Sequence, residues 1–316
     1  MTLRLRDRWV WDFWIADTGT EFHAFFLQAP RSRNDPDLRH EHATVGHAVS
    51  IDLVDWDVLP DALLPGPRGA WDDRAIWTGS VVESGGLWHL FYTGTSLAEG
   101  GSVQRIGLAI SRDLYSWSRH PDNPIIQSDG RWYEQLDPAV WPHLAWRDPW
   151  VFPDESGNGW HALITARGNS GPSSRRGVLG YARSEDLIHW TIEPPVANPG
   201  LFHHLEVPQV FQVRDRWYLI FSVDHRGGGV TYACPASSPL GPFDFANSFP
   251  LGGEYDYSGR LVTARDGRPR FLAFLNTRSD GSFIGELSDP ADVDIDSAGH
   301  LVLRRGTPAA TRSVST

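Results

Sequence analysis

Cysteine is almost absent from this sequence, with Cys234 the single one among 316 residues. A disulfide framework and a four-cysteine zinc site are therefore excluded. Long apolar runs are also missing, because no stretch approaches the roughly 20 residues that a membrane-spanning helix needs. Residues 1–9 lack the apolar segment of a signal peptide. These absences lead us to expect a soluble, cytoplasmic protein.

Basic residues are in the minority. Lys and Arg together number 28 against 39 Asp and Glu, which gives a net charge of −11. Proteins that bind nucleic acid or anionic lipid need clustered Lys and Arg. We therefore expect neither a nucleic acid nor a membrane as partner.

Helical periodicity is scarce as well, since no long segment places apolar residues three and four positions apart. The apolar residues instead form short runs, such as 88–92 and 217–221, bounded by turn residues. The chain holds 15 Trp, 15 Phe and 8 Tyr, which favour strands, and 31 Gly and 23 Pro, which favour turns. This pattern predicts an all-β protein.

One phrase recurs along the chain, a strand of small and apolar residues followed by Ser-x-x-Leu-x-x-aromatic. Its serines are Ser50, Ser111 and Ser184, with weaker copies at Ser237 and Ser288. An aromatic strand precedes each copy, at 22–29, 87–95, 160–167, 217–224 and 271–277. A further strand precedes each of those, at 9–16, 76–83, 148–153, 207–213 and 257–263. A fourth strand is expected after the aromatic residue, so each repeat is a four-stranded unit.

Five such units predict a five-bladed β-propeller, in which the first strand of each blade lines a central channel. No break in composition divides the chain, so we expect residues 1–305 to form a single domain. Residues 306–316 are small and polar and are expected to be a flexible tail. The alternative, a β-sandwich with fortuitous repeats, is disfavoured by five repeats in order.

Three of the predicted first strands begin with an acid, namely Asp12, Asp148 and Glu206. In a propeller these positions converge on one mouth of the channel, where neighbouring carboxylates raise at least one pKa. A raised pKa suits a general acid, and two carboxylates between aromatic walls suit glycoside hydrolysis. The plainer alternative is that the acids cap strands or pair with arginines, as Asp148 could with Arg147.

Four segments then resemble motifs of one known family. They are 46–63, similar to a first-blade signature; Trp-Thr-Gly-Ser at 77–80; Trp-Arg-Asp-Pro at 146–149; and Glu-Val-Pro at 206–208. In this order and spacing they resemble glycoside hydrolase family 32, the β-fructofuranosidases. The resemblance implies a five-bladed propeller and a retaining double displacement that needs no metal or cofactor.

The same resemblance implies roles for individual residues. Asp12 would be the nucleophile, Glu206 the general acid and base, and Asp148 the group that stabilises the transition state. Arg147 would bind substrate oxygens. Trp77 and Ser80 would line the subsite.

Two further residues are candidates from their place in the predicted blades. Trp14 suits either a subsite wall or a core position, and Asp256 suits either sugar binding in blade five or a turn. A metal site at His40 and His42 is disfavoured, because both lie in a charged loop.

The chain also departs from the family pattern. Phe13-Trp14-Ile15 follows Asp12 where the family has Pro-Asn-Gly, and Trp11-Asp12-Phe13-Trp14 is more similar to the first motif of family 68 fructosyltransferases. The propeller leaves no room for the C-terminal β-sandwich common in family 32. The missing sandwich and exposed aromatic residues are consistent with a homodimer.

The functional expectation is a retaining hydrolase that cleaves a terminal β-D-fructofuranosyl unit from a disaccharide or small oligosaccharide. The alternatives are a fructosyltransferase on the same fold, an inverting family 43-like arabinofuranosidase or xylosidase, and a non-catalytic sugar-binding propeller.

Overall fold

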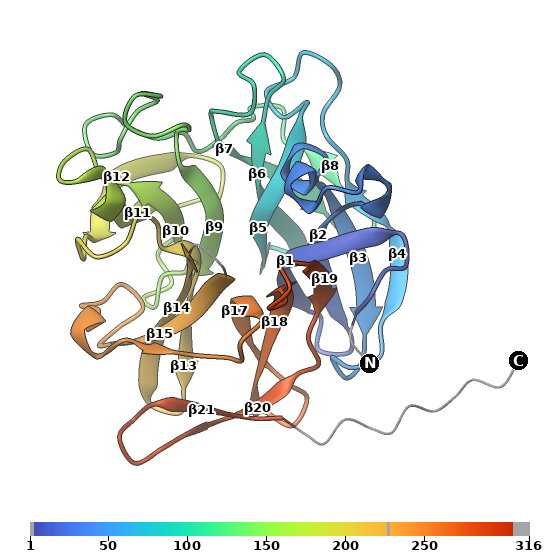
Figure 1. The fold of residues 1–316 in the computed structure, drawn as a ribbon, viewed down its shortest axis with the longest axis vertical. Coiled ribbons are helices and arrows are strands. Elements are labelled where there is room, and N and C mark those ends of the chain that lie inside the picture. Colours follow the sequence, from blue (N-terminus) through green and yellow to red (C-terminus); the bar gives the residue numbers. More distant parts are fainter. Residues whose placement is uncertain (1–2, 226–227, 306–316) are drawn as a thin grey trace, which may run out of the picture.

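Five antiparallel sheets stand around a central channel in the computed structural model, which describes residues 3–225 and 228–305 (Figure 1). Each sheet is one blade, and its strands follow one another in chain order from the channel outward. The predicted all-β, five-bladed propeller is therefore confirmed. The predicted tail, 306–316, lies outside the described residues.

The blades contain these strands. Blade one comprises β1 (Arg8–Asp17), β2 (Phe22–Pro30), β3 (Thr44–Ser50) and β4 (Asp57–Leu63). Blade two comprises β5 (Ala75–Ser84), β6 (Leu87–Thr95), β7 (Arg105–Ser111) and β8 (Ser118–Arg119). Blade three comprises β9 (Trp146–Pro153), β10 (Trp160–Arg167), β11 (Gly177–Ser184) and β12 (Trp190–Ala197). Blade four comprises β13 (Glu206–Val213), β14 (Arg216–His225), β15 (Gly228–Ala236) and β16 (Phe249–Pro250). Blade five comprises β17 (Asp256–Thr263), β18 (Pro269–Thr277), β19 (Phe283–Leu287), β20 (Ala291–Ile295) and β21 (Leu301–Arg304).

Helical structure in the described residues is limited to short 3-10 turns. They are η1 (Arg31–Arg33), η2 (Pro36–Glu41), η3 (Ser173–Arg175) and η4 (Phe245–Asn247). None of the described helices is long and apolar enough to cross a membrane.

The recurring serine phrase forms the turn between the third and fourth strands. In the first three blades the Ser Oγ accepts the backbone N–H of the leucine three residues later at 2.9 Å. Those leucines, Leu53, Leu114 and Leu187, are buried and have φ between 66° and 70°. Each repeat therefore marks a turn whose leucine is buried in the core.

Blade five departs from the pattern because its third strand is split. β19 pairs with β18 at Phe274 and Leu287, whereas β20 pairs with it at Phe271 and Ala291. Pro290, which has no N–H to donate to the ladder, stands between the two pieces.

The ring is closed by the first described residues. Leu287 of β19 donates its backbone N–H to the carbonyl of Leu3 at 3.1 Å, and Arg4 lies 3.2 Å from Glu286. The start of the chain is thus held against blade five, as Figure 1 shows by the proximity of β1 and β19.

Candidate active site

A β-bulge interrupts the innermost strand of every blade at the same place in the ladder. The pairing shifts after Trp11 in β1, Trp77 in β5, Arg147 in β9, Glu206 in β13 and Tyr257 in β17. At four of the five bulges the next residue has a positive φ, namely Asp12, Asp148, Val207 and Ser258. Because a bulge re-aims side chains, the same local distortion is used five times to build one site.

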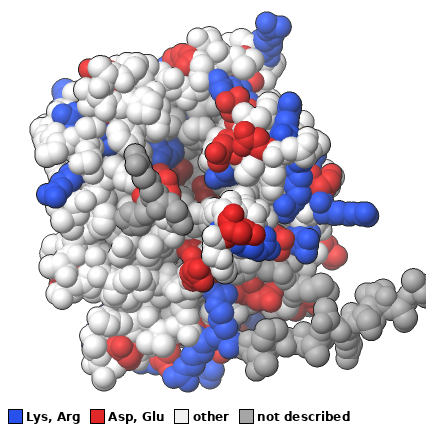
Figure 2. Space-filling model, viewed as in Figure 1, with Lys and Arg blue, Asp and Glu red and all other residues white. Residues whose placement is uncertain are grey.

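The two residues at each bulge line one cavity of about 710 Å³ at the mouth of the channel. We call the first of each pair the pre-bulge residue: Trp11, Trp77, Arg147, Glu206 and Tyr257. We call the second the bulge residue: Asp12, Thr78, Asp148, Val207 and Ser258. Figure 2 shows the hollow at the centre of this face, with acidic and basic side chains inside it.

Five of the eight sequence candidates are brought together in this cavity, namely Asp12, Trp77, Arg147, Asp148 and Glu206. The three acids do not occupy fully equivalent positions. Asp12 and Asp148 are bulge residues, whereas Glu206 lies one residue earlier in its strand.

The other three candidates do not line the cavity. Trp14 is 1% exposed, stacks on Phe25, and lines a second cavity of about 240 Å³ farther along the same strands. Ser80 accepts the N–H of Val151 and joins blades two and three. Asp256 accepts the N–H of Gly253 at a turn. It also pairs with Arg305.

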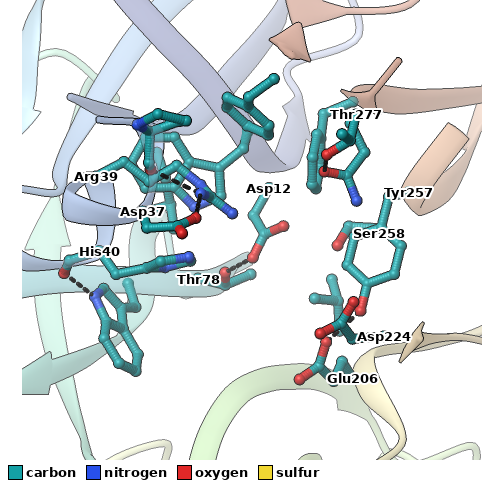
Figure 3. A pocket seen from close by; sticks show the side chains of 18 of the residues that line it. Asp12, Asp37, Arg39, His40, Thr78, Glu206, Asp224, Tyr257, Ser258 and Thr277 are labelled. Carbon is teal, nitrogen blue, oxygen red and sulfur yellow. Dashed lines mark hydrogen bonds and ion pairs between the residues drawn. The ribbon is translucent and has the colours of Figure 1, made fainter. Parts of the chain in front are cut away.

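Asp12 lies on β1, partly exposed to the cavity, and accepts a hydrogen bond of 2.5 Å from the Thr78 hydroxyl (Figure 3). Burial raises the pKa of Asp12, and the charge of Glu206 adds to the rise. The Thr78 hydrogen bond and the charge of Arg260 act in the opposite direction. The Thr78 hydrogen bond therefore orients the Asp12 carboxyl group and favours its ionised form against the effect of burial.

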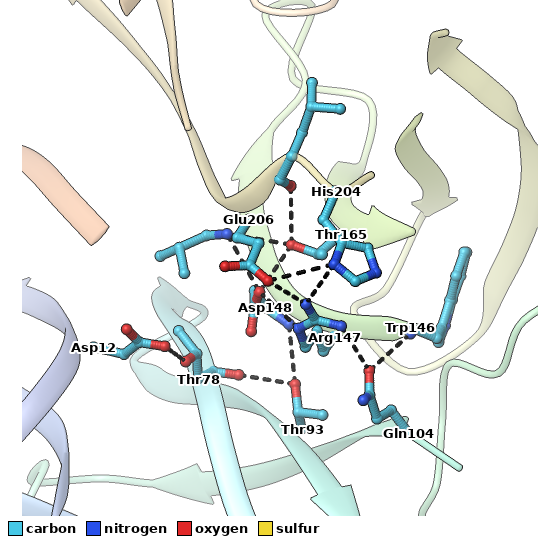
Figure 4. A network of polar contacts seen from close by, with 12 residues as sticks. Asp12, Thr78, Thr93, Gln104, Trp146, Arg147, Asp148, Thr165, His204 and Glu206 are labelled. Carbon is cyan, nitrogen blue, oxygen red and sulfur yellow. Dashed lines mark hydrogen bonds and ion pairs between the residues drawn. The ribbon is translucent and has the colours of Figure 1, made fainter. Parts of the chain in front are cut away.

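Three side chains contact the Glu206 carboxylate. Arg147 Nη2 lies 2.5 Å and His204 Nδ1 3.5 Å from its Oε1 (Figure 4). The Tyr257 hydroxyl donates to its Oε2. Burial acts to raise the pKa of Glu206, but the hydrogen bond from His204 and the charge of Arg147 outweigh it and hold the pKa below its usual range. These contacts therefore favour the carboxylate form of Glu206.

Asp148 shows the opposite shift. Burial raises its pKa to about 7, against the charge of Arg147, and the charges of Asp12 and Glu206 add to the rise. Its Oδ2 accepts the Thr165 hydroxyl at 2.8 Å, and Arg147 Nε lies 3.5 Å away. The raised pKa expected from clustered carboxylates is thus found at Asp12 and Asp148, and not at Glu206.

One wall of the cavity comes from outside the innermost strands. His40 from η2 lies edge-on to Trp77, whose indole donates to the His40 carbonyl at 2.8 Å. Burial lowers the pKa of His40 to about 3 and that of His143 to about 4, so both are neutral hydrogen-bonding groups near neutral pH.

Sequence reasoning missed several lining residues. Thr78 and Ser258 occupy, in blades two and five, the bulge position that Asp12 occupies in blade one. An alignment of the five innermost strands could therefore have found them. Arg39 and His40 lie in a turn between strands, where no repeated pattern points to the site.

The model of the glycosyl hydrolases family 32 N-terminal domain matches residues 15–260. The chain belongs to glycosyl hydrolase family 32. The matched part of this family 32 protein includes Arg147, Asp148, Glu206 and Tyr257, whereas Asp12 lies three residues before it.

Curated relatives of this family 32 protein are similar over parts of their length. A levanase from Bacillus sp. (strain L7) is 27% identical over 83% of this chain and 30% of its own. A sucrose-6-phosphate hydrolase from Escherichia coli is 28% identical over 66% of this chain and 39% of its own. A fructan 6-exohydrolase from Triticum aestivum is 32% identical over 54% of this chain and 27% of its own. The chain spans only about a third of the length of these relatives.

Solved structures share the fold at low identity. The Bombyx mori family 32 β-fructofuranosidase BmSUC1 matches with a TM-score of 0.73 at 17% identity, over 96% of this chain and 64% of its own. An inulosucrase from Halalkalicoccus jeotgali bound to kestose matches with a TM-score of 0.74 at 19% identity, over 95% of this chain and 87% of its own.

Proposed function

We propose that this protein is a retaining glycoside hydrolase that releases a terminal β-D-fructofuranosyl unit from an uncharged saccharide. The observation that carries the proposal is the placement of Asp12 and Glu206 on different sides of one cavity, with Arg147 and Asp148 beside Glu206 (Figures 3 and 4). Membership of family 32 and the fructoside-hydrolysing relatives support the same substrate class.

In the first step Asp12 attacks the anomeric carbon of the fructosyl unit while Glu206 gives a proton to the departing glycosidic oxygen. The aglycone leaves as an alcohol and a fructosyl ester forms on Asp12. In the second step Glu206 removes a proton from water, which attacks the same carbon and restores Asp12 as a carboxylate. Arg147 and Asp148 hold fructose hydroxyls as positive charge develops on the ring.

The first step requires a protonated Glu206, whereas its contacts with Arg147 and His204 favour its carboxylate. A sugar bound against Glu206 removes water from around it, which raises its pKa. A sugar hydroxyl that takes over the Arg147 hydrogen bond weakens the contact that lowers the pKa. Substrate binding therefore favours the protonated form of Glu206, which the first step needs.

Charge around the cavity favours an uncharged substrate over a phosphorylated one. Its acidic lining comprises Asp12, Asp35, Asp37, Asp148, Glu206 and Asp224. Arg39 and Arg147 are the basic side chains of the described lining, and the sequence contains no lysine. Each arginine already has an acidic partner, Asp37 at 3.6 Å and Glu206 at 2.5 Å. A phosphate dianion would meet more negative than positive charge.

The reaction is tested by NMR on the products from sucrose, 1-kestose, sucrose 6-phosphate and an aryl α-L-arabinofuranoside, with methanol added as a competing acceptor. We expect methyl β-D-fructofuranoside and fructose from sucrose or 1-kestose, and at least tenfold lower kcat/KM with sucrose 6-phosphate. An α-anomeric methyl product, or inversion on the arabinofuranoside with no fructose release, would overturn the proposal. Longer fructosyl oligosaccharides as the main product would identify a transferase instead.

Isosteric variants test the assigned roles. Asp12→Asn removes the nucleophile and is expected to abolish turnover, and Glu206→Gln is expected to lower kcat by about 10²–10⁴-fold. Wild-type thermal unfolding must be retained for either result to count. Activity in both variants near that of the wild type would refute the roles.

A further inference from the structure

Arg260 is a buried cation that the reaction steps above do not use. It stands two residues after Ser258 in β17, at the position that follows the bulge, and is 1% exposed. A buried guanidinium is costly unless its hydrogen bonds are satisfied and opposite charge lies nearby. Its surroundings therefore indicate what it does.

The Arg260 guanidinium bridges the two strands that carry the proposed nucleophile and acid. Its Nε donates to the carbonyl of Phe13 at 3.2 Å, and its Nη1 donates to the carbonyl of Pro208 at 3.0 Å. Phe13 directly follows Asp12 in β1, and Pro208 belongs to the bulge that follows Glu206 in β13. The arginine thus crosses from blade five to blades one and four at the bulges that aim both carboxyl groups.

The guanidinium is held in place from the other side by Trp150, whose ring centroid lies 5.0 Å from Cζ. Its remaining nitrogen, Nη2, is buried without a hydrogen-bond partner among the described residues. No described carboxylate forms a direct ion pair with it. Asp12 and Asp148 are the acids whose charge acts on it.

From these contacts we infer that Arg260 is a positioning residue for the reaction. It fixes the spacing of the β1 and β13 bulges through its hydrogen bonds to Phe13 and Pro208, and its positive charge favours the ionised form of Asp12. The inference rests on the proposed roles of Asp12 and Glu206.

Other charges also act on Asp12, and the inference must hold in their presence. The titratable and charged groups that face it are Arg39 of η2, Asp148 of β9, Glu206 of β13, and Tyr257 and Arg260 of β17. Arg147 forms its ion pairs with Asp148 and Glu206. Burial lowers the pKa of Arg260 to about 10, so it remains charged at neutral pH and opposes the rise in the pKa of Asp12.

The test compares the pH profile of kcat, which reports the enzyme–substrate complex, in three variants. Arg260→Gln removes the charge, and we expect the acid limb to move up by about one pH unit. Arg260→Lys keeps the charge but cannot make both hydrogen bonds, so kcat is expected to fall while the acid limb stays in place. Gln209→Met is the matched control, because Gln209 holds the equivalent position in β13 and bridges to Leu261 with two uncharged hydrogen bonds of 2.8 Å. It is expected to lower stability and leave the acid limb unchanged.

An unmoved acid limb in Arg260→Gln, or equal shifts in Arg260→Gln and Arg260→Lys, would show a purely structural arginine and overturn the inference. Absence of wild-type activity on every fructoside would instead overturn the proposed function. If Arg260→Gln does not fold, the Arg260→Lys profile decides, since a shifted limb there contradicts the charge-based role.

A measurement without substrate tests the charge interaction independently. Thermal unfolding is compared for the wild type, Asp12→Asn, Arg260→Gln and the double variant. We expect Arg260→Gln to lower the unfolding midpoint less in the Asp12→Asn background, because the carboxylate that the arginine stabilises is gone. Equal losses in both backgrounds would show that the two charges do not interact.

Discussion

Removing the Tyr257 hydroxyl should move the basic limb of the enzyme's pH profile upward. The hydroxyl donates to Oε2 of Glu206, the side of the carboxylate that Arg147 does not contact. Burial raises the pKa of Tyr257 far above its usual value, so the hydroxyl keeps its proton and remains a donor throughout the assay range. The variant Tyr257→Phe keeps the ring and deletes this one hydrogen bond.

The size of the shift follows from the chemistry of the bond. A hydrogen bond to a charged group contributes about 1.5–3 kcal/mol. One pKa unit corresponds to about 1.36 kcal/mol, so complete loss raises the pKa of Glu206 by about one to two units. The contacts from Arg147 and His204 remain, so we expect about one unit. Because Glu206 must be protonated to act as the acid, a higher pKa extends activity to higher pH.

The assay is the pH dependence of kcat with sucrose, which reports the enzyme–substrate complex, where the bound sugar has raised the pKa of Glu206. Tyr115→Phe serves as the matched control, because Tyr115 is 50% exposed and does not line the cavity. Its profile should equal that of the wild type. A basic limb in Tyr257→Phe that stays in place, or moves to lower pH, would refute the assignment of Glu206 as the proton donor.

Three further perturbations test other parts of the structure. Thr78→Val deletes the 2.5 Å hydrogen bond to Asp12, so the pKa of Asp12 rises and the acid limb of the pH profile of kcat moves up. Burial lowers the pKa of His47 to about 4, below its unfolded value near 6.5. The wild type should therefore lose about 3 kcal/mol of unfolding free energy as the pH falls through that window. His47→Gln should lose less when urea titrations at pH 7 and pH 4.5 are compared. Glu134→Gln removes the buried carboxylate that pairs with Arg167 at 2.7 Å, so urea unfolding at pH 7 should show a loss of about 3 kcal/mol.

Each of these has an outcome that would contradict it. An acid limb unmoved in Thr78→Val would show that this bond does not stabilise the Asp12 carboxylate. Equal pH sensitivity in His47→Gln and the wild type would remove His47 as the cause. For Glu134, the control is Asp129→Asn, whose partner Arg131 is exposed, so we expect a much smaller loss of unfolding free energy. Equal losses in the two variants would refute the distinction between buried and exposed pairs.

Much of the fold could be predicted from the sequence because the repeat records it directly. The expected strands 87–95 and 160–167 coincide with β6 and β10, and the serine phrase marks the turn that follows each third strand. The split third strand of blade five corresponds to the most fragmentary copy, at Ser288.

The site was less predictable, because a bulge shifts which side chains face the cavity. Simple alternation along β1 places Trp14 on the same side as Asp12, but the extra residue in the ladder sends Trp14 toward the second cavity. The same register places Ser80 between two blades. The sequence shows which residues are present, but it does not show where a β-bulge shifts the strand pairing by one residue. The cavity wall formed by η2 depends on how this turn packs against the strands, and no periodic pattern in the sequence predicts that packing.

The Arg260 to Phe13 hydrogen bond spans 247 residues of chain. At roughly 5–20 residues per second of synthesis, Asp12 leaves the ribosome some 12–50 seconds before the arginine that steadies it. The five bulges also draw on all five blades, so no set of four contains a complete site. A nascent or cleaved chain that ends before β17 carries every carboxyl group assigned to the reaction and yet is expected to be inert. On the proposed roles, we therefore expect catalytic competence to appear late, when the last blade docks against the first.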